Sequence, residues 1–197
     1  MPEKTTTRPA ISAKDRILEA AMVRFSSGSY DETSLRDIAS DADVDVAYVH
    51  RSFGSKEKLF DAVVRQALQS RRFLADIDGD VAGALARRAV NRRATANGDI
   101  ALLEIIIRSL LSPNAGPLLR EHLEQDFIAP LSELLERPSE QCAAVIAALL
   151  VGIGILKNVL EIKALSRGGA GQLESLIQLT IEAIMAGDPN VVASRKA

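Results

Sequence analysis

Two short helical patterns separated by a tight turn lie between Thr33 and Leu59, in the stretch TSLRDIASDADVDVAYVHRSFGSKEKL. Apolar residues of the first pattern recur at helical spacing, at Leu35, Ile38, Ala39 and Ala42. Thr33 precedes this pattern, and we expect its hydroxyl to cap the helix. In the second pattern, VAYVHRSF, the apolar residues are Val46, Val49 and Phe53, and Asp45 is the expected cap. A helix as short as the second is stable only when it packs against neighbours.

Two short helices joined by a turn of this length are typical of a helix-turn-helix. In such a motif the second helix lies in the major groove of DNA and the first crosses the phosphate backbone. After Gly54 and Ser55, the sequence KEKLFDAVVRQALQSRRF predicts a longer helix. A further helix precedes the motif, with Ser12 and Asp15 forming a capping box at its start. Tyr30, in the loop that follows this helix, is expected to pack against the core of the small domain.

The motif residues resemble the N-terminal domain of TetR-type transcriptional repressors. The resemblance rests on T-S-L-R-D-I-A-S-D-A-D-V, on the helix ending His50-Arg51-Ser52-Phe53, and on Ser55-Lys56-Glu57-Lys58-Leu59, and it covers roughly residues 12–65. It implies an all-α homodimer in which two helix-turn-helix domains bind a palindromic operator. It also implies that a small molecule in the second domain releases the DNA.

Carried over position by position, the resemblance implies nine DNA-binding residues. They are Thr33, Ser34 and Lys56 at phosphates, Val46, Ala47, Tyr48 and His50 at base edges, and Arg51 and Ser52 at backbone or bases. The chain departs from the family pattern at Asp45, Ala47 and Tyr48, where serine, glycine and a small hydroxyl residue are common. His50-Arg51-Ser52 stands where tyrosine, tyrosine or tryptophan, and histidine are usual. No operator sequence is therefore carried over from the family.

The charge balance is less basic than DNA-binding domains usually are. The whole chain has a net charge of −2, and residues 1–75 contain twelve Lys and Arg against eleven Asp and Glu, a difference of +1. Basic residues nevertheless fall where DNA contacts are expected, at Lys4, Arg8, Lys14, Arg51, Lys56 and Lys58. Asp41, Asp43 and Asp45 crowd the turn and would repel phosphate unless they cap helices or point away. These acids keep open a second hypothesis, a dimeric helical interaction module that has lost specific DNA binding.

Composition sets the class of protein. The chain has 197 residues, of which 47% are hydrophobic and 25% charged, which is the balance of a soluble globular protein. The N-terminus lacks the apolar run of a signal peptide, and the longest uncharged run, CAAVIAALLVGIGIL, is shorter than the ~20 residues of a membrane span. We therefore expect a cytoplasmic protein without a membrane segment. Cys142, the single cysteine, lies in an apolar setting that favours a buried and inert thiol.

The predicted fold class is all-α. We expect an N-terminal arm and three-helix DNA-binding domain over residues 1–54, a linking helix over 55–75, and an effector-binding and dimerisation domain over 76–197. Pro130 should kink or end the helix in which it lies. The last two helices carry long apolar stripes, and two copies of each would form a four-helix interface in a homodimer.

Six aliphatic and aromatic residues of the second domain are candidates for an effector pocket. They are Leu102, Leu103, Ile106, Leu110, Phe127 and Leu131, and Glu104, Arg108 or Gln125 could orient a ligand. Phe127 is the only aromatic residue after Phe73, which disfavours an aromatic cage for a flat cation. The expected ligand is apolar or amphipathic, of acyl or terpenoid character. The alternative is that all six residues are simply core.

No catalytic or metal site is expected. His122 and Asp126 are four residues apart, but one histidine and one acid are too few ligands for a metal, so a surface hydrogen bond is the preferred interpretation. His50 is the only other histidine, and neither lies in a catalytic motif, which makes an all-α enzyme the least favoured class. We expect no cofactor.

Overall fold

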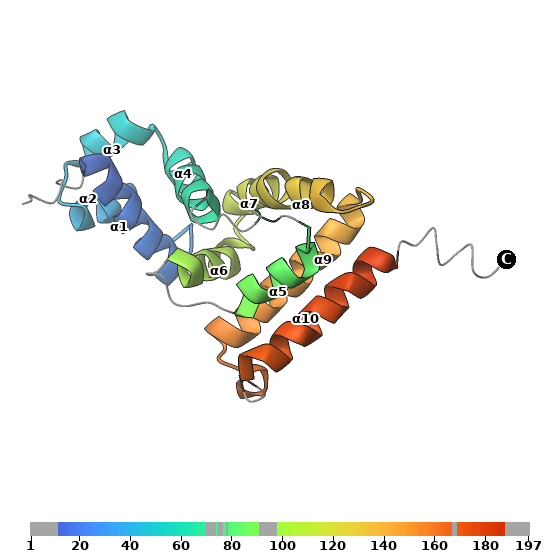
Figure 1. Cartoon of the computed structure of the whole chain (residues 1–197). Coiled ribbons are helices and arrows are strands. Elements are labelled where there is room, and N and C mark those ends of the chain that lie inside the picture. The colour runs from blue at the N-terminus through green and yellow to red at the C-terminus, as the bar shows by residue number, and fades with distance from the viewer. Residues whose placement is uncertain are drawn as a thin grey trace, which may run out of the picture.

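The computed structural model describes residues 12–69, 74, 77, 79–90, 98–166 and 169–187. Throughout these residues the regular elements are helices, and no strand occurs among them. Figure 1 shows the N-terminal helices gathered at one end and a longer helical array at the other. The all-α fold class predicted from the sequence is confirmed.

The N-terminal elements are α1 (Ala13–Ser27), α2 (Leu35–Asp41), α3 (Val46–Phe53) and α4 (Lys56–Gln69). The Ser12 hydroxyl accepts a hydrogen bond from the backbone N–H of Asp15, and the Asp45 carboxylate accepts one from Ala47. Both caps were predicted, and both are confirmed. They satisfy backbone donors that the first turn of a helix cannot pair internally.

The cap of α2 is Ser34, so the prediction that Thr33 fills this role is wrong. The Ser34 hydroxyl accepts from the backbone N–H of Asp37, while the Asp37 carboxylate accepts from the backbone N–H of Ser34, which together form a capping box. Thr33 is only 6% exposed, and its hydroxyl donates to the carbonyl of Ser29 at 3.0 Å. The side chain of Thr33 therefore fixes the α1–α2 loop.

Three aromatic rings occupy the centre of the N-terminal core. Phe25 stacks on Tyr30 with ring centroids 5.9 Å apart, and Phe60 meets both rings edge-on at 5.0 Å. All three side chains are almost fully buried, which confirms the predicted packing of Tyr30. Burial of side chains of this size stabilises a fold by about 1.5–3 kcal/mol each. The rings thereby fix α4 against α1 and the loop after it.

The remaining elements are α5 (Val81–Val90), α6 (Gly98–Ser109), α7 (Ala115–Leu123), η1 (Glu124–Ile128), α8 (Ala129–Leu134), α9 (Glu140–Gly154), η2 (Ile155–Val159), η3 (Lys163–Leu165) and α10 (Gly169–Ala186). Here η1 and η2 are π-helical turns and η3 is a 3-10 turn. The π turn η1 ends two residues before Pro130, which lies in the first turn of α8. Because proline has no N–H and its ring crowds the preceding turn, the regular α-helical pattern is interrupted there, as the sequence predicted.

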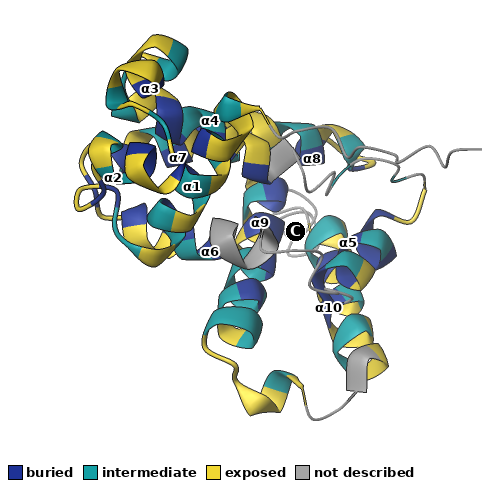
Figure 2. Cartoon of the chain, turned by 90° about the vertical axis from the view of Figure 1, so that its left-hand side faces the viewer, coloured by how far each residue is buried: buried dark blue, intermediate teal, exposed yellow. Residues whose placement is uncertain are grey.

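The buried side chains form two cores rather than one. The first joins α1–α4 to α6 and α7, through Ile105, Ile106, Ala115 and Leu119. The second lies among α5, α8, α9 and α10 and includes Leu131, Ile146 and Ile181. Figure 2 shows α5 beside α10, with buried positions on both helices. Helices α6 and α7 are thus packed on the N-terminal helices, and α10 packs chiefly on α5.

The helix α9 continues through η2 without a break, so it is longer than its uncharged run. By length and composition alone, Glu140–Val159 is the one candidate membrane span within the described parts of the chain, with a mean hydropathy of 2.2. Core helices of soluble proteins meet the same criterion, so this is weak grounds for a membrane segment. Cys142 on this helix is 8% exposed, which confirms the predicted buried thiol.

Candidate nucleic-acid interface

Helix α3 presents a polar face to solvent and packs against the first core through its opposite, apolar face. Val49 is fully buried in the first core, and Val46 and Phe53 are partly buried against it. The exposed residues of the helix are Ala47, Tyr48, His50 and Arg51. Four of the nine predicted DNA-binding residues therefore share one accessible surface, which we call the α3 face.

Two side chains of the α3 face interact with each other. The guanidinium carbon of Arg51 lies 5.8 Å from the centroid of the Tyr48 ring, within the range of a cation–π contact. Stacking of this kind limits the conformations of Arg51 and leaves the edge of its guanidinium free to donate. An arginine held in this way can bind a guanine edge or a phosphate with two parallel hydrogen bonds.

Other predicted residues are less accessible. Thr33 is buried and its hydroxyl is used within the loop, so we remove its side chain from the proposed contact set. Val46 and Ser52 are half-buried at the margins of the α3 face. Ser34 is exposed, but its hydroxyl already donates to the Asp37 carboxylate, with which a phosphate would have to compete.

Lys56, the predicted phosphate contact at the start of α4, is packed over an aromatic ring. Its Nζ lies 4.3 Å from the centroid of the Tyr30 ring. Partial burial lowers the pKa of Lys56, and the nearby carboxylates of Asp31 and Glu57 oppose that shift. Its position is therefore set by the same aromatic cluster that fixes α4.

Two of the three acids in the turn have internal partners. Arg24 on α1 donates to both carboxylate oxygens of Asp41, at 2.5 and 2.8 Å, and this pairing lowers the pKa of Asp41. Asp45 caps α3. At Asp43 the backbone adopts a positive φ of 51°, and the Nε of Arg16 donates to the neighbouring carbonyl of Ala42 at 3.1 Å. The repulsion that these acids would exert on phosphate is reduced by these contacts.

One basic residue of this surface was missed by sequence reasoning. Arg36 is exposed in the first turn of α2, the helix expected to cross the DNA backbone. Its position two residues after Ser34, a predicted phosphate contact, could have identified it as a further contact from the sequence alone. Lys58, which the sequence had placed among the expected DNA contacts, is also exposed, in the first turn of α4. Both extend the positive charge on either side of the α3 face. Lys4 and Arg8, expected in a basic arm, lie outside the described residues.

His122 forms a contact between two parts of the chain that the sequence did not predict. Its Nδ1 lies 2.7 Å from Asp126 Oδ2, as the spacing suggested, but its Nε2 lies 2.8 Å from Asp61 Oδ1 on α4. The residue is 6% exposed, so the expected surface hydrogen bond is in fact buried. Among the described residues, no group of three or more His, Cys, Asp or Glu could hold a metal ion. We call this Asp61–His122–Asp126 arrangement the histidine bridge.

The predicted pocket residues whose side chains the structure describes are divided between the two cores and the surface. Ile106 belongs to the first core and Leu131 to the second, while Phe127 is packed against the second and Leu110 is 61% exposed. Leu103 is 2% exposed, and the side chain of Leu102 lies outside the described set. Regular apolar spacing shows that each helix has a buried face, but not which core that face joins.

Ile106 and Leu110 do line a groove, which we call the α6–α7 groove. Its volume is ≈ 530 Å³, and the other lining residues are Ser112, Pro113, Gly116, Pro117, Leu119, Arg120, Leu123, Glu124 and Ile128. The walls are mainly apolar, with Arg120 and Glu124 as the charged groups. Of the orienting groups predicted from the sequence, Arg108 donates to the Ser26 carbonyl at 2.8 Å and Gln125 donates to Glu121.

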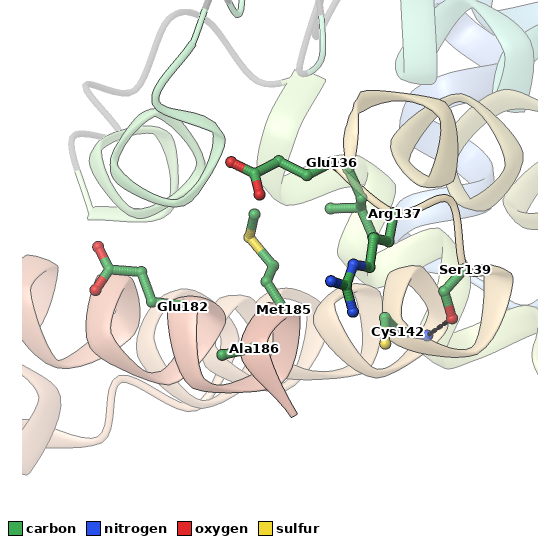
Figure 3. Close-up of a pocket in the computed structure, with 8 residues that line it drawn as sticks. Glu136, Arg137, Ser139, Cys142, Glu182, Met185 and Ala186 are labelled. Carbon is green, nitrogen blue, oxygen red and sulfur yellow. Dashed lines mark hydrogen bonds between the residues drawn. The ribbon is translucent and has the colours of Figure 1, made fainter. Parts of the chain in front are cut away.

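A second cavity, of ≈ 460 Å³, lies between the α8–α9 loop and the end of α10. Figure 3 shows Glu136, Arg137 and Glu182 around it, with the Met185 side chain extending toward Glu136. None of the six predicted residues lines this cavity. Its charged rim fits an apolar ligand less well than the α6–α7 groove does.

Two family models match the chain. The model for bacterial regulatory proteins of the tetR family matches residues 17–63, and the model for the tetracyclin repressor-like C-terminal domain matches residues 80–185. A curated relative, the probable HTH-type transcriptional regulator YttP of Bacillus subtilis strain 168, is 38% identical over 56 residues. That alignment covers 28% of this chain and 27% of the relative. The detailed sequence similarity is therefore confined to about a quarter of each protein.

Solved structures match the fold over most of the chain. The multidrug binding protein EbrR, solved with imidazole, is 22% identical and has a TM-score of 0.63, covering 85% of this chain and 94% of its own. EbrR has also been solved with ethidium. A regulator from Streptomyces coelicolor A3 is 22% identical, with a TM-score of 0.62 over 91% of this chain and 98% of its own. With a capped α3 bearing an exposed polar face, and with family models matching both halves, the chain belongs to the TetR family of bacterial transcriptional regulators.

Proposed function

We propose that this protein is a cytoplasmic, dimeric repressor that binds a palindromic operator through the α3 face. The observation that carries the proposal is the α3 face itself: four exposed residues on a helix that Asp45 caps and Val49 anchors. The side chains offer donors, an acceptor-capable imidazole and an aromatic ring, which suits contacts to base edges. We assign Ser34, Lys56, Arg36 and Lys58 to flanking phosphates, and Val46 and Ser52 to the margins of the contact.

The dimer is proposed to form through α9 and α10. Exposed apolar side chains lie along this part of the chain, at Val145, Leu156, Leu160, Leu176 and Leu179, with exposed fractions between 44% and 62%. At Gly152 on α9, no neighbouring atom lies within 4 Å of the position that a Cβ would occupy, so a partner helix could approach closely there. Pairing of this surface with its own copy would bury it and give two α3 faces related by two-fold symmetry. Their spacing would then be about one DNA turn, on the order of 34 Å or a small multiple.

The effector is proposed to bind in the α6–α7 groove. Aliphatic walls suit an apolar chain or ring system, and Arg120 at the groove suits a carboxylate or another polar head group. Phe127 does not line the groove, and no other aromatic residue follows Phe73 in the sequence. A fatty acid or terpenoid is therefore the proposed ligand class, in contrast to the flat cation ethidium that EbrR accommodates.

The histidine bridge offers a route from this groove to the DNA-binding helices. Arg120, Leu123 and Glu124 line the groove, and His122 and Asp126 lie on the same continuous helical segment. A ligand that shifts this segment must either carry Asp61 and α4 along through the contact with His122 or break that contact. Since α4 follows α3 after a two-residue turn, the movement would change the position of the α3 face.

Selection of bound sequences from a random DNA library tests the proposal. The full-length protein is expected to enrich a palindrome with two half-sites, because a symmetric dimer presents two identical α3 faces. Failure to enrich any sequence would contradict the proposal and favour the alternative, a helical interaction module without specific DNA binding. Enrichment of a single, non-repeated half-site would contradict the dimer while retaining the DNA contact.

A further inference from the structure

The His50 side chain is fixed to the end of its own helix. The backbone N–H of Gly54 donates to the His50 carbonyl at 2.8 Å, and the Nδ1 of His50 lies 3.2 Å from the Gly54 carbonyl oxygen. Gly54 has φ +85° and ψ −63°, a conformation that residues with a Cβ rarely adopt, and it turns the carbonyl back toward the helix. The imidazole therefore has a defined orientation before any DNA is bound.

This contact determines which ring nitrogen of His50 carries the proton. A carbonyl oxygen can only accept a hydrogen bond, so Nδ1 must be the donor. In a neutral imidazole the other nitrogen, Nε2, then has a lone pair and acts only as an acceptor. Within the described chain no hydrogen bond engages Nε2, and His50 is exposed on the α3 face. The α3 face thus carries one acceptor with a fixed direction.

An acceptor on a reading helix can pair with only some groups of DNA. Phosphate oxygens, guanine N7 and O6, and thymine O4 all accept, so none of them can bond to a lone pair. The donors in the major groove are the N6 amine of adenine and the N4 amine of cytosine. The other side chains of the face differ in this respect: Ala47 is apolar, Arg51 only donates, and the Tyr48 hydroxyl can do either.

We propose that His50 is a specificity-determining residue that accepts a hydrogen bond from the exocyclic amine of an adenine or cytosine in each operator half-site. The proposal rests on the proposed function, since it requires specific DNA binding by α3. It adds the base class read at one position and the atom, Nε2, that reads it. Because the Gly54 contact already orients the ring, little side-chain entropy is lost on binding.

The test combines base analogues with variants of His50 in the full-length protein. On the selected operator, each adenine is replaced in turn by purine, which lacks the N6 amine, and each cytosine by pyrimidin-2-one, which lacks the N4 amine. Affinities are measured near pH 8, where an ordinary imidazole is neutral. The variants are His50→Phe, which removes both nitrogens, His50→Asn, whose amide is placed near Nδ1, and His50→Gln, whose amide reaches the position of Nε2.

One position in each half-site should respond in a way that depends on His50. Loss of the amine there should weaken binding by the wild type about 5-fold, the value of one neutral hydrogen bond. His50→Phe and His50→Asn should be insensitive to the same replacement, and His50→Gln should regain part of the sensitivity. All four proteins should respond equally to amine removal at the remaining positions.

Two results would overturn the inference while leaving the proposed function intact. One is specific binding in which no amine deletion distinguishes the wild type from His50→Phe. The other is a position at which His50→Asn keeps the full sensitivity of the wild type while His50→Phe loses it, because the Asn amide lies near Nδ1 and does not supply the acceptor assigned to Nε2. If no operator is enriched at all, the failure is that of the proposed function itself. His50 is exposed, so the variants are expected to fold, and circular dichroism spectra check this.

Discussion

The Nε2 of His122 lies 2.8 Å from Oδ1 of Asp61, a residue 61 positions earlier in the chain. The other ring nitrogen is 2.7 Å from Asp126, so a single imidazole joins α4 to the helical segment that contains η1. Both ring nitrogens thus lie within hydrogen-bond distance of carboxylate oxygens, and Arg65 also donates to Asp61, at 3.1 Å.

Removal of this imidazole should destabilise the protein. His122→Ala would leave two partly exposed carboxylates without their shared partner and a small cavity beside α4. We expect a loss of about 1–3 kcal/mol in the free energy of unfolding, because each broken hydrogen bond to a charged group costs on that scale and exposure reduces the effect. Urea denaturation of both proteins measures the difference.

The other histidine provides the matched control. His50→Ala makes the same chemical change at an exposed site and should alter the free energy of unfolding by about 0.5 kcal/mol or less. Equal effects of the two substitutions would show that the histidine bridge adds no stability beyond that of a surface residue.

The apolar surface of α9 and α10 should control the oligomeric state. Leu179 is 62% exposed in the single chain, and in the proposed dimer it would be covered by the partner. Leu179→Glu should convert the dimer to a monomer, because burial of an unpaired carboxylate is strongly unfavourable. Size-exclusion chromatography with light scattering gives the mass directly.

Leu111 is the control for this substitution. It is 91% exposed on the α6–α7 connection, away from the proposed dimer surface, so Leu111→Glu should remain dimeric. A wild type that is monomeric at all concentrations, or a Leu179→Glu variant that stays dimeric, would contradict the proposed interface.

Ligands of the proposed class should stabilise the fold through the α6–α7 groove. In a thermal-shift series of straight-chain fatty acids, terpene alcohols and ethidium, the apolar ligands should raise the melting temperature and ethidium should not. Leu110→Gln should abolish the shift, because Leu110 lines the groove, whereas Leu111→Gln at the neighbouring residue should preserve it. Stabilisation by ethidium alone would refute the proposed ligand class.

The pairing of Arg24 with Asp41 should appear in the acid dependence of stability. The Arg24 guanidinium holds the pKa of Asp41 below its ordinary value of 3.8. Since the folded-state pKa is the lower one, the stabilisation is fully present above the ordinary value and is lost as pH falls through the folded value. The melting temperature of the wild type should therefore exceed that of Asp41→Asn at neutral pH, and the gap should close below about pH 3.8.

A surface acid elsewhere separates this effect from general acid destabilisation. Glu133→Gln, an exposed position on α8, should show only a small difference in melting temperature at either pH. A gap between wild type and Asp41→Asn that stays constant from neutral to acid pH would contradict the role assigned to the ion pair.

Local signals in the sequence were sufficient for the N-terminal helices. Capping residues act on the backbone within three positions, so Ser12 and Asp45 could be assigned as caps from spacing alone. The error at Thr33 was avoidable by the same reasoning. Ser34 is followed three residues later by Asp37, which is the same capping-box spacing that identified the start of α1. The residue three positions after Thr33 is Arg36, which cannot complete a capping box.

Long-range features could not be read in this way. The contact between His122 and Asp61 depends on how α4 packs against α7, and nothing in the sequence near either residue specifies it. Ile106 and Leu131 have similar apolar surroundings in the sequence but join different cores. Apolar spacing therefore could not establish a shared pocket for these residues, because periodicity reports which face of a helix is buried and not what covers it.

The affinity of Arg51→Ala for the selected operator, measured by gel shift over a salt series, tests the central proposal most directly. Arg51 lies on the α3 face, and its loss should weaken specific binding about 10-fold or more while leaving binding to scrambled DNA much less affected. Arg137→Ala removes the same side chain from the connection between α8 and α9, two helices that lie far from α3 in Figure 1, and this variant should bind the operator like the wild type. Unchanged affinity and specificity in Arg51→Ala would contradict the assignment of α3 as the helix that reads DNA.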